Sequence, residues 1–319
     1  MNPERLPADL ALVPASLRAY ADQLRTDNPW RGTPVPGARR IILLGMGSSG
    51  FAASLAAAHL QAAGVDAVAA LASSTILPAA GPDAVVLAIS ATGSSPETLA
   101  AAGRYVDRAP VIAVTNTAGS PLTELAAVTV DLSAGVEVSG VACRSYRHTL
   151  ALLLALLVRR ERTATLIADA AERAAESTED LLDRMAQWAP RAGELLLGRD
   201  GTAVVAPAAR LASAAQSALM LRESPRRLAI AAETGEWSHI EVYLTKSTDY
   251  RMLLLTGSPW QPALLRWCAE RGSTVVAVGE ELNDVSMVIR HRHDDDQWAR
   301  LLCEVLVAEV VAAEAFSSQ

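Results

Sequence analysis

Residues 84–99 read AVVLAISATGSSPETL, and this stretch decides the fold class. The run from Ala84 to Ile89 is apolar throughout, which is typical of a strand that is buried on both faces. Small hydroxyl-bearing residues and a glycine follow at 90–95, and Pro96 suits the first turn of a helix. The order predicts a strand, a tight turn and a helix, which is the repeating unit of a parallel α/β sheet.

The same alternation of strand and helix runs through both halves of the chain. In the first half we predict strands at 40–44, 65–71, 84–90, 110–115 and 128–132. Residues 141–190 read as long helices, and further strands are predicted at 202–206, 228–232, 251–256, 274–278 and 286–290. We therefore expect an α/β protein with two tandem domains, each a parallel sheet between two layers of helices.

Breaks in this pattern place the domain boundaries. Residues 1–37 read as a helical lead-in that ends in a linker rich in Pro and Gly. A charged run at 159–162 separates the two halves, so the expected domains are 38–160 and 161–319. The chain of 319 residues is long enough for two domains of about 150 residues each.

Composition and charge exclude several classes of function. The net charge of −7 leaves no basic surface for nucleic acid or an anionic membrane. The three cysteines, Cys143, Cys268 and Cys303, lack the spacing of a metal site and fit a reducing compartment. The sequence shows no secretion signal, and its longest apolar run is about half of a membrane span. We expect a cytoplasmic protein without a nucleic-acid or membrane partner.

The turn after Ile89 has the composition of an anion site. Ser90, Thr92 and Ser95 offer hydroxyl donors, and Gly93 allows close approach of the backbone. Free N–H groups at a helix N-terminus favour anions, so a phosphate would be held here by neutral donors. The alternative is an ordinary helix cap, but a cap needs only one hydroxyl.

A second glycine-rich turn follows the first strand, at Gly45-Met46-Gly47-Ser48-Ser49-Gly50. Its glycine spacing formally matches a dinucleotide fingerprint, but no acidic residue ends the second strand. Two other interpretations stay open, namely close packing of strand on helix, or hydroxyls of Ser48 and Ser49 that contact a polyol. A nucleotide-dependent oxidoreductase is thus a minor alternative.

Together these motifs resemble the sugar isomerase (SIS) family of phosphosugar-binding α/β domains. The 90–95 turn resembles the family's Ser-x-Ser-Gly-x-Thr phosphate motif, and residues 115–122, TNTAGSPL, match its Thr-Asn-x-x-Gly-Ser-x-Leu run. Residues 134–137 resemble its Ala-Gly-x-Glu, and Arg144 stands where the family often has lysine. The resemblance implies eight substrate-binding residues: Gly47, Ser48, Ser49, Ser90, Thr92, Gly93, Ser95 and Arg144.

The second half resembles the second domain of double-SIS enzymes, in which a glutamate ending a helix is followed sixteen residues later by a histidine. Glu223 and His239 have that spacing. The resemblance implies that Glu223 shuttles the proton between C2 and C1 of the sugar, and that His239 opens the ring. It also implies a homodimer with a shared active site, and chemistry that needs neither metal nor cofactor.

The sequence departs from the family at its lysines. Synthases and deaminases of the family carry a lysine near the glutamate, whereas Met220 stands three residues before Glu223 and the chain has a single lysine, Lys246. We therefore expect a phosphosugar isomerase. An amino-sugar phosphate deaminase and a non-catalytic sugar-phosphate-binding protein are the alternatives.

Two further features invite a simpler interpretation. The run HRHDDD at 291–296 is expected to be a solvated loop and not a metal site. Trp237, two residues before His239, is expected to serve packing and not ligand stacking.

Overall fold

The computed structural model describes residues 2–81, 83–157 and 162–317. The predicted boundary between residues 160 and 161 lies outside the described residues. The chain separates into two compact units. The first unit comprises Ser16–Val136 and Arg144–Ala171, and the second comprises Met1–Ala15, Glu137–Cys143 and Glu172–Gln319.

The first unit holds a five-stranded parallel sheet with the order β2-β1-β3-β4-β5. Its strands are β1 (Arg40–Gly45), β2 (Asp66–Leu71), β3 (Ala84–Ile89), β4 (Val111–Thr115) and β5 (Val128–Asp131). In the central part of the sheet, Ile42 of β1 lies beside Val86 of β3. All six residues of β3 are buried, as expected of a strand covered on both faces.

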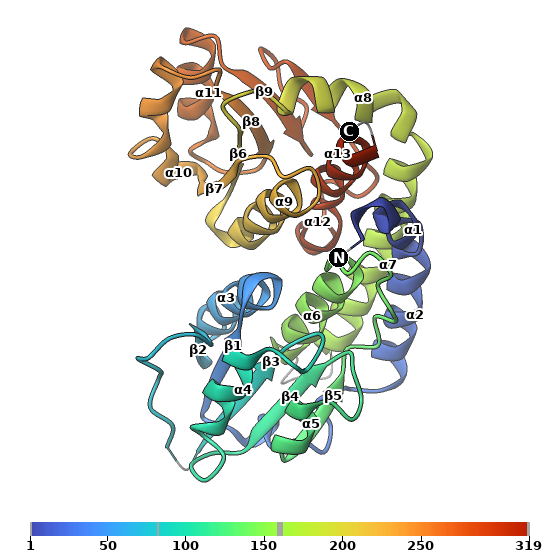
Figure 1. Ribbon diagram of the computed structural model, residues 1–319, viewed down its shortest axis with the longest axis vertical. Coiled ribbons are helices and arrows are strands. Elements are labelled where there is room, and N and C mark those ends of the chain that lie inside the picture. Colours follow the sequence, from blue (N-terminus) through green and yellow to red (C-terminus); the bar gives the residue numbers. More distant parts are fainter. Residues whose placement is uncertain (1, 82, 158–161, 318–319) are drawn as a thin grey trace. The chain divides into compact units, whose positions relative to one another are not determined.

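Helices cover both faces of this sheet, with α3 on one side and α4 and α5 on the other (Figure 1). The helices of the unit are α2 (Val13–Thr26), α3 (Gly47–Ala62), α4 (Pro96–Gly103), α5 (Pro121–Leu125), α6 (Arg144–Leu154) and the first part of α7 (Arg162–Asp183). Residues of α4 and α5 share a core with alternate residues of β1 and β3, including Ile42, Leu44 and Val86. The apolar pattern after Pro96 predicts a helix to about Val106, but α4 ends at Gly103.

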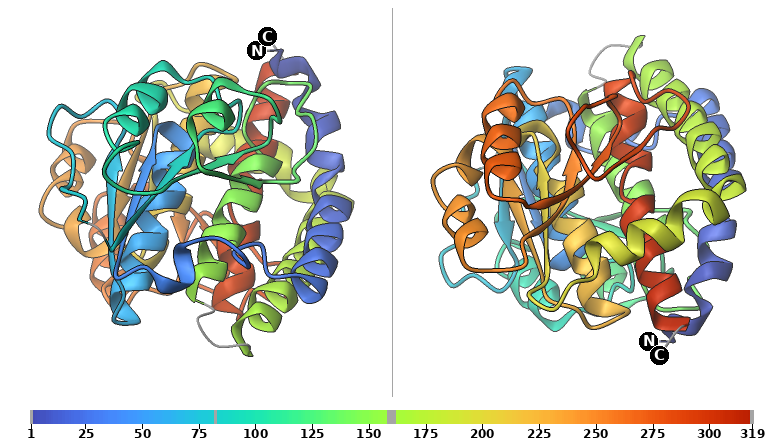
Figure 2. Two further views of the ribbon diagram at one scale, coloured as in Figure 1. Left: turned by 90° about the horizontal axis from the view of Figure 1, so that it is seen from below. Right: turned by 90° about the horizontal axis from the view of Figure 1, so that it is seen from above.

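The second unit contains the other parallel sheet, in the order β10-β9-β8-β6-β7. Its strands are β6 (Thr202–Ala206), β7 (Ala229–Glu233), β8 (Arg251–Leu255), β9 (Thr274–Val278) and β10 (Met287–Ile289). The helices are α1 (Leu6–Ala11), α8 (Met185–Leu196), α9 (Leu211–Glu223), α10 (Thr234–Trp237), α11 (Gln261–Glu270), α12 (Gln297–Cys303) and α13 (Leu306–Ser317). The α1 and α13 helices, far apart in sequence, lie side by side in both views of Figure 2.

All ten predicted strands are present, and their ends agree with the prediction to within one residue. The pattern at residues 298–315 predicts one closing helix, but the structure divides it between α12 and α13. The two sheets also share one topology. Read in reverse, the second sheet runs β7-β6-β8-β9-β10, so that β6 corresponds to β1 and β8 to β3. The predicted α/β fold, with two parallel sheets in tandem, is confirmed.

Two absences apply to the described parts of the chain, 2–81, 83–157 and 162–317. None of the helices there is long and apolar enough to cross a membrane. No group of three or more His, Cys, Asp or Glu side chains gathers there in a way that would hold a metal ion. Each of the three cysteines is buried.

The glycine-rich turn after β1 is explained by close packing at its two ends. A Cβ atom added to Gly45 would lie 2.8 Å from the carbonyl carbon of Ser49 and 2.9 Å from the backbone nitrogen of Gly50. A Cβ at Gly50 would in turn lie 3.2 Å from the carbonyl oxygen of Gly45. The two glycines therefore let β1 and the start of α3 approach each other. This packing explains the presence of Gly45 and Gly50 without a bound nucleotide.

We predict that Gly45→Ala lowers the free energy of unfolding by about 1–3 kcal/mol, because the added methyl group meets backbone atoms that cannot move aside. Thermal and urea unfolding would measure the change. Gly37→Ala is the matched control, because a Cβ at Gly37 has nothing within 4 Å. Equal stabilities of the two variants would contradict the packing explanation.

Candidate functional site

The turn at 90–95 lies at the carboxyl end of β3, where the chain enters α4. The first sheet reverses its strand order between β1 and β3, because the chain moves outward to β2 in one direction and to β3 and β4 in the other. Open parallel sheets bind ligands at the carboxyl ends of the strands at such a switch point. The turns after β1 and β3 are therefore the expected walls of a binding site.

Ser95 acts as the N-cap of α4. Its Oγ accepts a hydrogen bond from the backbone N–H of Thr98 at 3.3 Å and donates to the Glu97 carboxylate at 2.9 Å. Capping thus accounts for this one hydroxyl. It does not account for Thr92, which is exposed, or for Ser90, whose hydroxyl has no hydrogen-bond partner among the described residues. The turn carries more donors than a cap requires.

Gly93 holds the turn against the segment that follows β4. It has a φ of +63°, and a Cβ there would overlap the side chain of Ser120. Its carbonyl accepts the backbone N–H of Leu122 at 3.0 Å. Ser120 is buried, and its Oγ has no partner in the described part of the chain. The 115–122 run therefore packs against the turn through Ser120 and Leu122.

Two hydroxyls near the turn were not among the predicted site residues. Ser94 is exposed beside Thr92, and its Oγ donates only to the Thr92 carbonyl, at 3.2 Å. Ser120 is the other. Ser94 follows Gly93 directly in the hydroxyl-rich run, so the run itself was a signal for it. Ser120 required the tertiary contact with Gly93.

The turn after β1 also leaves donors available. The α3 helix begins at Gly47, and its N-cap residue, Met46, provides no side-chain cap. Ser48 and Ser49 lie half-buried in the first turn, and their hydroxyls have no partners among the described residues. The first N–H groups of this sixteen-residue helix are thus not satisfied by a cap and suit an acceptor ligand.

One carboxylate shares the N-terminus of α4. Glu97 accepts from Ser95, and hydrogen bonds from its own backbone N–H and from that hydroxyl hold its pKa below the usual range. A phosphate at this helix end would have to lie beside this negative charge. The donors of the neighbouring α3 turn do not carry such a carboxylate in their first turn.

Arg144 begins α6 and is buried, with 6% of its surface exposed. Its Nη2 donates to the carbonyl oxygen of Val136 at 2.5 Å. A Cβ at Gly135 would lie 3.2 Å from its Nη1. The guanidinium thus closes the loop between residues 136 and 144, and its predicted contact with the substrate stays a prediction.

Glu223 is the last residue of α9 in the second unit and is half-buried. Burial raises its pKa above the usual value for a carboxyl group, and the adjacent Arg222 opposes that shift. A carboxyl group with a raised pKa exchanges protons more readily near neutral pH. Its surroundings therefore suit acid–base chemistry.

His239 lies in an exposed turn after α10, and its backbone N–H donates to the Glu236 carbonyl at 2.8 Å. Glu233 caps α10 by accepting the N–H groups of Gly235 and Glu236. No hydrogen bond or ion pair joins His239 to Glu223 in the described residues. The imidazole is thus open to solvent and free to meet a ligand.

Trp237, just before His239, is fully buried, and its Nε1 donates to the Tyr250 hydroxyl at 2.7 Å. The prediction that it serves packing is confirmed. Lys246 is exposed at the end of the 3₁₀ segment Glu241–Lys246.

The 291–296 run forms a turn, as predicted, but two of its residues are buried where solvation was expected. His291 is 6% exposed, and Asp294 is 9% exposed because it pairs with Arg290. His293 lies 2.6 Å from a carboxylate oxygen of Glu176, and Asp296 caps α12. Asp294, His293 and Asp296 therefore have local structural partners.

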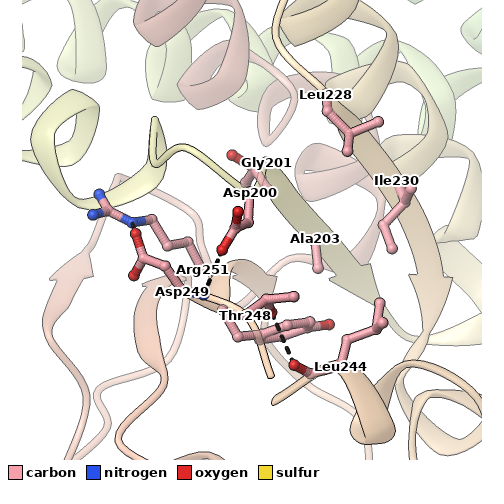
Figure 3. A pocket seen from close by; sticks show the side chains of 11 residues that line it. Asp200, Gly201, Ala203, Leu228, Ile230, Leu244, Thr248, Asp249 and Arg251 are labelled. Atoms are coloured by element: carbon pink, nitrogen blue, oxygen red, sulfur yellow. Dashed lines mark hydrogen bonds and ion pairs between the residues drawn. The ribbon is translucent and has the colours of Figure 1, made fainter. Parts of the chain in front are cut away.

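A small, mostly apolar pocket lies at the opposite edge of the second sheet (Figure 3). It opens beside the amino ends of β6, β7 and β8, where Asp200 accepts the backbone N–H of Asp249 at 2.8 Å. None of the predicted site residues lines it. Because parallel sheets bind ligands at their carboxyl ends, we do not assign the function to this pocket.

Comparison with known proteins identifies the first sheet. Residues 37–159 match the SIS domain family. The chain contains a SIS domain. The turns after β1 and β3 and Arg144 lie within the matched segment, whereas Glu223 and His239 lie beyond it. No curated protein matches the sequence.

Solved structures extend the SIS fold to the whole chain. The C-terminal domain of glucosamine-fructose-6-phosphate aminotransferase from Francisella tularensis superposes with a TM-score of 0.83 at 15% identity, over 97% of this chain and 95% of that one. Tagatose-6-phosphate ketose/aldose isomerase from Escherichia coli gives 0.78 at 16% identity, over 98% and 92%. Glucosamine-6-phosphate deaminase from Thermotoga maritima gives 0.70 at 15% identity, over 96% and 94%. The fold is therefore that of two tandem SIS domains, and it serves several chemistries.

The raised pKa of Glu223 predicts how its replacement changes stability with pH. Above the folded pKa, the carboxylate is less favourable in the folded than in the unfolded chain, so its ionisation lowers stability. We expect Glu223→Gln to raise the melting temperature at pH 7, and this gain to shrink as the pH falls toward 4.

Glu97→Gln is the control with the opposite sign, because the pKa of Glu97 is lowered. Its carboxylate favours the folded state above its unfolded pKa, so the variant should be less stable than the wild type at pH 7. Melting curves from pH 4 to 8 measure both. Shifts of equal sign in the two variants would contradict the assignment.

Proposed function

We propose that this protein is an aldose–ketose isomerase that acts on a phosphorylated sugar, with or without an amino group, and uses no metal. The observation that carries the proposal is the 90–95 turn, which combines surplus hydroxyl donors with the start of α4 at the switch point of a SIS sheet. The three similar proteins named above all carry a sugar 6-phosphate in their names.

In this proposal the first SIS domain binds the terminal phosphate. Ser90, Thr92 and Ser95 contribute hydroxyls, and Gly93 lets the backbone approach the anion. Gly47, Ser48 and Ser49 offer a second helix start to the sugar hydroxyls or the phosphate. Neutral donors of this kind bind phosphate without a buried counter-charge.

Glu223 and His239 perform the chemistry in this proposal. The imidazole of His239 takes the proton of the C1 hydroxyl and gives one to the ring oxygen as the C1–O5 bond of the cyclic aldose breaks, which leaves the open-chain aldehyde. The carboxylate of Glu223 then takes the proton from C2, which leaves an enediolate, and returns it to C1 as the C2 hydroxyl proton passes to O1, which gives the ketose. The half-buried position and raised pKa of Glu223 support this role.

Isomerisation is favoured over deamination by the absence of an amine at the expected position. Met220, three residues before Glu223, is fully buried, and the single lysine lies at the end of an exposed 3₁₀ segment. The same proposal includes a cytoplasmic homodimer in which residues of both subunits complete each active site. A sugar-phosphate-binding protein without catalysis is the second candidate, because its phosphate turn would look the same.

We expect Glu223→Gln to slow exchange of the C2 proton with solvent by about 100-fold or more, because the amide cannot accept the proton. NMR in D₂O with a panel of hexose 6-phosphates and amino-hexose 6-phosphates measures both exchange and product. Full exchange in the variant would overturn the role of Glu223. Ammonium release from an amino sugar would identify a deaminase, and tight binding without turnover across the panel would identify a sensor.

We expect Thr92→Val to weaken phosphosugar binding by at least about tenfold, because it removes a hydroxyl donor to the phosphate. Calorimetry measures the affinity, and the melting temperature should change little because Thr92 is exposed. Thr26→Val, at an exposed threonine on α2, is the control. Equal affinity in the Thr92 and Thr26 variants would make the turn an ordinary helix cap.

A further inference from the structure

The second sheet has its own switch point, between β6 and β8. The chain leaves β6 toward Arg210 and leaves β8 through Thr256-Gly257-Ser258-Pro259. This position corresponds to the 90–95 turn of the first sheet, because β8 corresponds to β3. Both turns contain Thr-Gly-Ser followed by Pro, as TGSSP at 92–96 and TGSP at 256–259. The repeated topology therefore presents a second candidate ligand site.

Arg210 is a buried arginine at this switch point, with 6% of its surface exposed. Its Nη1 pairs with a carboxylate oxygen of Glu304, and its Nη2 donates to the Thr256 carbonyl. Its charge is thus balanced within the protein, since Glu304 is itself 1% exposed.

Arg300 reaches the same place from α12 and is not balanced in this way. Its Nη2 donates to the Thr256 hydroxyl at 3.0 Å, which is the one hydrogen bond its guanidinium makes to the described residues. No carboxylate in the described part of the chain lies within ion-pair distance of it. A guanidinium has five N–H donors, so most of them lack a protein acceptor. Burial and the neighbouring charge of Arg210 lower the pKa of this half-buried group, and the carboxylates of Glu304, Glu280 and Asp294 partly oppose that shift.

Two glycines make room for the guanidinium groups. Gly257 and Gly279 both have a φ of +110°. A Cβ at Gly257 would lie 3.1 Å from Nη1 of Arg300 and 3.2 Å from Nη2 of Arg210, and a Cβ at Gly279 would overlap Arg300. The backbone conformation and the arginine positions therefore depend on each other.

We infer that the carboxyl end of the second sheet is a second binding site, for a phosphate monoester or similar small oxyanion, with Arg300 as its ligand-facing cation. The anion supplies the acceptors that Arg300 lacks and offsets the second of two adjacent positive charges. Glu280 lies on the rim, exposed, and takes a hydrogen bond from Gln261 at 3.4 Å. Its carboxylate suits a hydroxyl of the ligand and disfavours a polyanion.

This inference does not rest on the proposed isomerase activity, and phosphate binding tests the two separately. Equilibrium dialysis with labelled inorganic phosphate should find two sites per chain in the wild type. Arg300→Gln should weaken one of them by at least about tenfold and leave the other. Thr92→Val should weaken the other, and the double variant should bind at neither.

Arg266→Gln is the matched control, because Arg266 is an exposed arginine of α11 in the same unit and the charge change is identical. Melting curves show whether Arg300→Gln still folds. If it does not, Arg300→Lys is the second variant, because it keeps the positive charge and should retain part of the phosphate binding. Binding by Arg300→Gln that equals that of the wild type and of Arg266→Gln would overturn the second site. Loss in Arg300→Gln with no change in Thr92→Val would instead overturn the first site and leave this one standing.

Discussion

The burial of the central strands on both faces is the constraint on which the rest of the structure depends. Every residue of β3 is buried, and in β8 and β9 every residue after the first is buried. Strands of this kind can carry no polar side chains, so the chemistry of the chain must lie where the strands end. Because all the strands in a sheet are parallel, their carboxyl ends meet at one edge, and the residues that follow them come together there.

The two SIS sheets use the same edge in different ways. After β3, hydroxyl groups and open helix N-termini offer neutral donors, and Ser95 and Gly93 fix the turn through the cap and the contact with Ser120. After β8, two arginines converge on a turn of related sequence, and in the described residues only Arg210 forms an ion pair with a carboxylate, that of Glu304. The two sheets thus share one topology but differ in the polarity of their turns.

The close packing of helix on strand explains why glycines recur at these edges. Gly45 and Gly50 allow α3 to approach β1, while Gly93 and Gly279 leave space for a side chain of another segment. A glycine pattern alone does not distinguish these cases from a nucleotide site, because all of them need a missing Cβ. The neighbouring atoms distinguish them, and for Gly45 they are backbone atoms of its own turn.

The sequence by itself determined the fold class and the positions of the ten strands, because short apolar runs that alternate with helices favour a parallel sheet covered on both faces. It also placed the 90–95 turn at a helix start and Trp237 in the core. Local pattern was insufficient for the helix ends, such as Gly103, and for the 291–296 run, where pairing with Arg290 buries Asp294.

Only the tertiary structure decided which hydroxyls and charges have partners. Ser95 proved to be a cap, the Ser90 hydroxyl has no hydrogen-bond partner in the described part of the chain, and Arg144 proved to close a loop. Ser120 joined Gly93 from the next βα turn, and Arg210 met Arg300 across about ninety residues. These partners come from different strands and helices, and the spacing of residues along one segment carries no information about contacts that the sheet edge creates between segments.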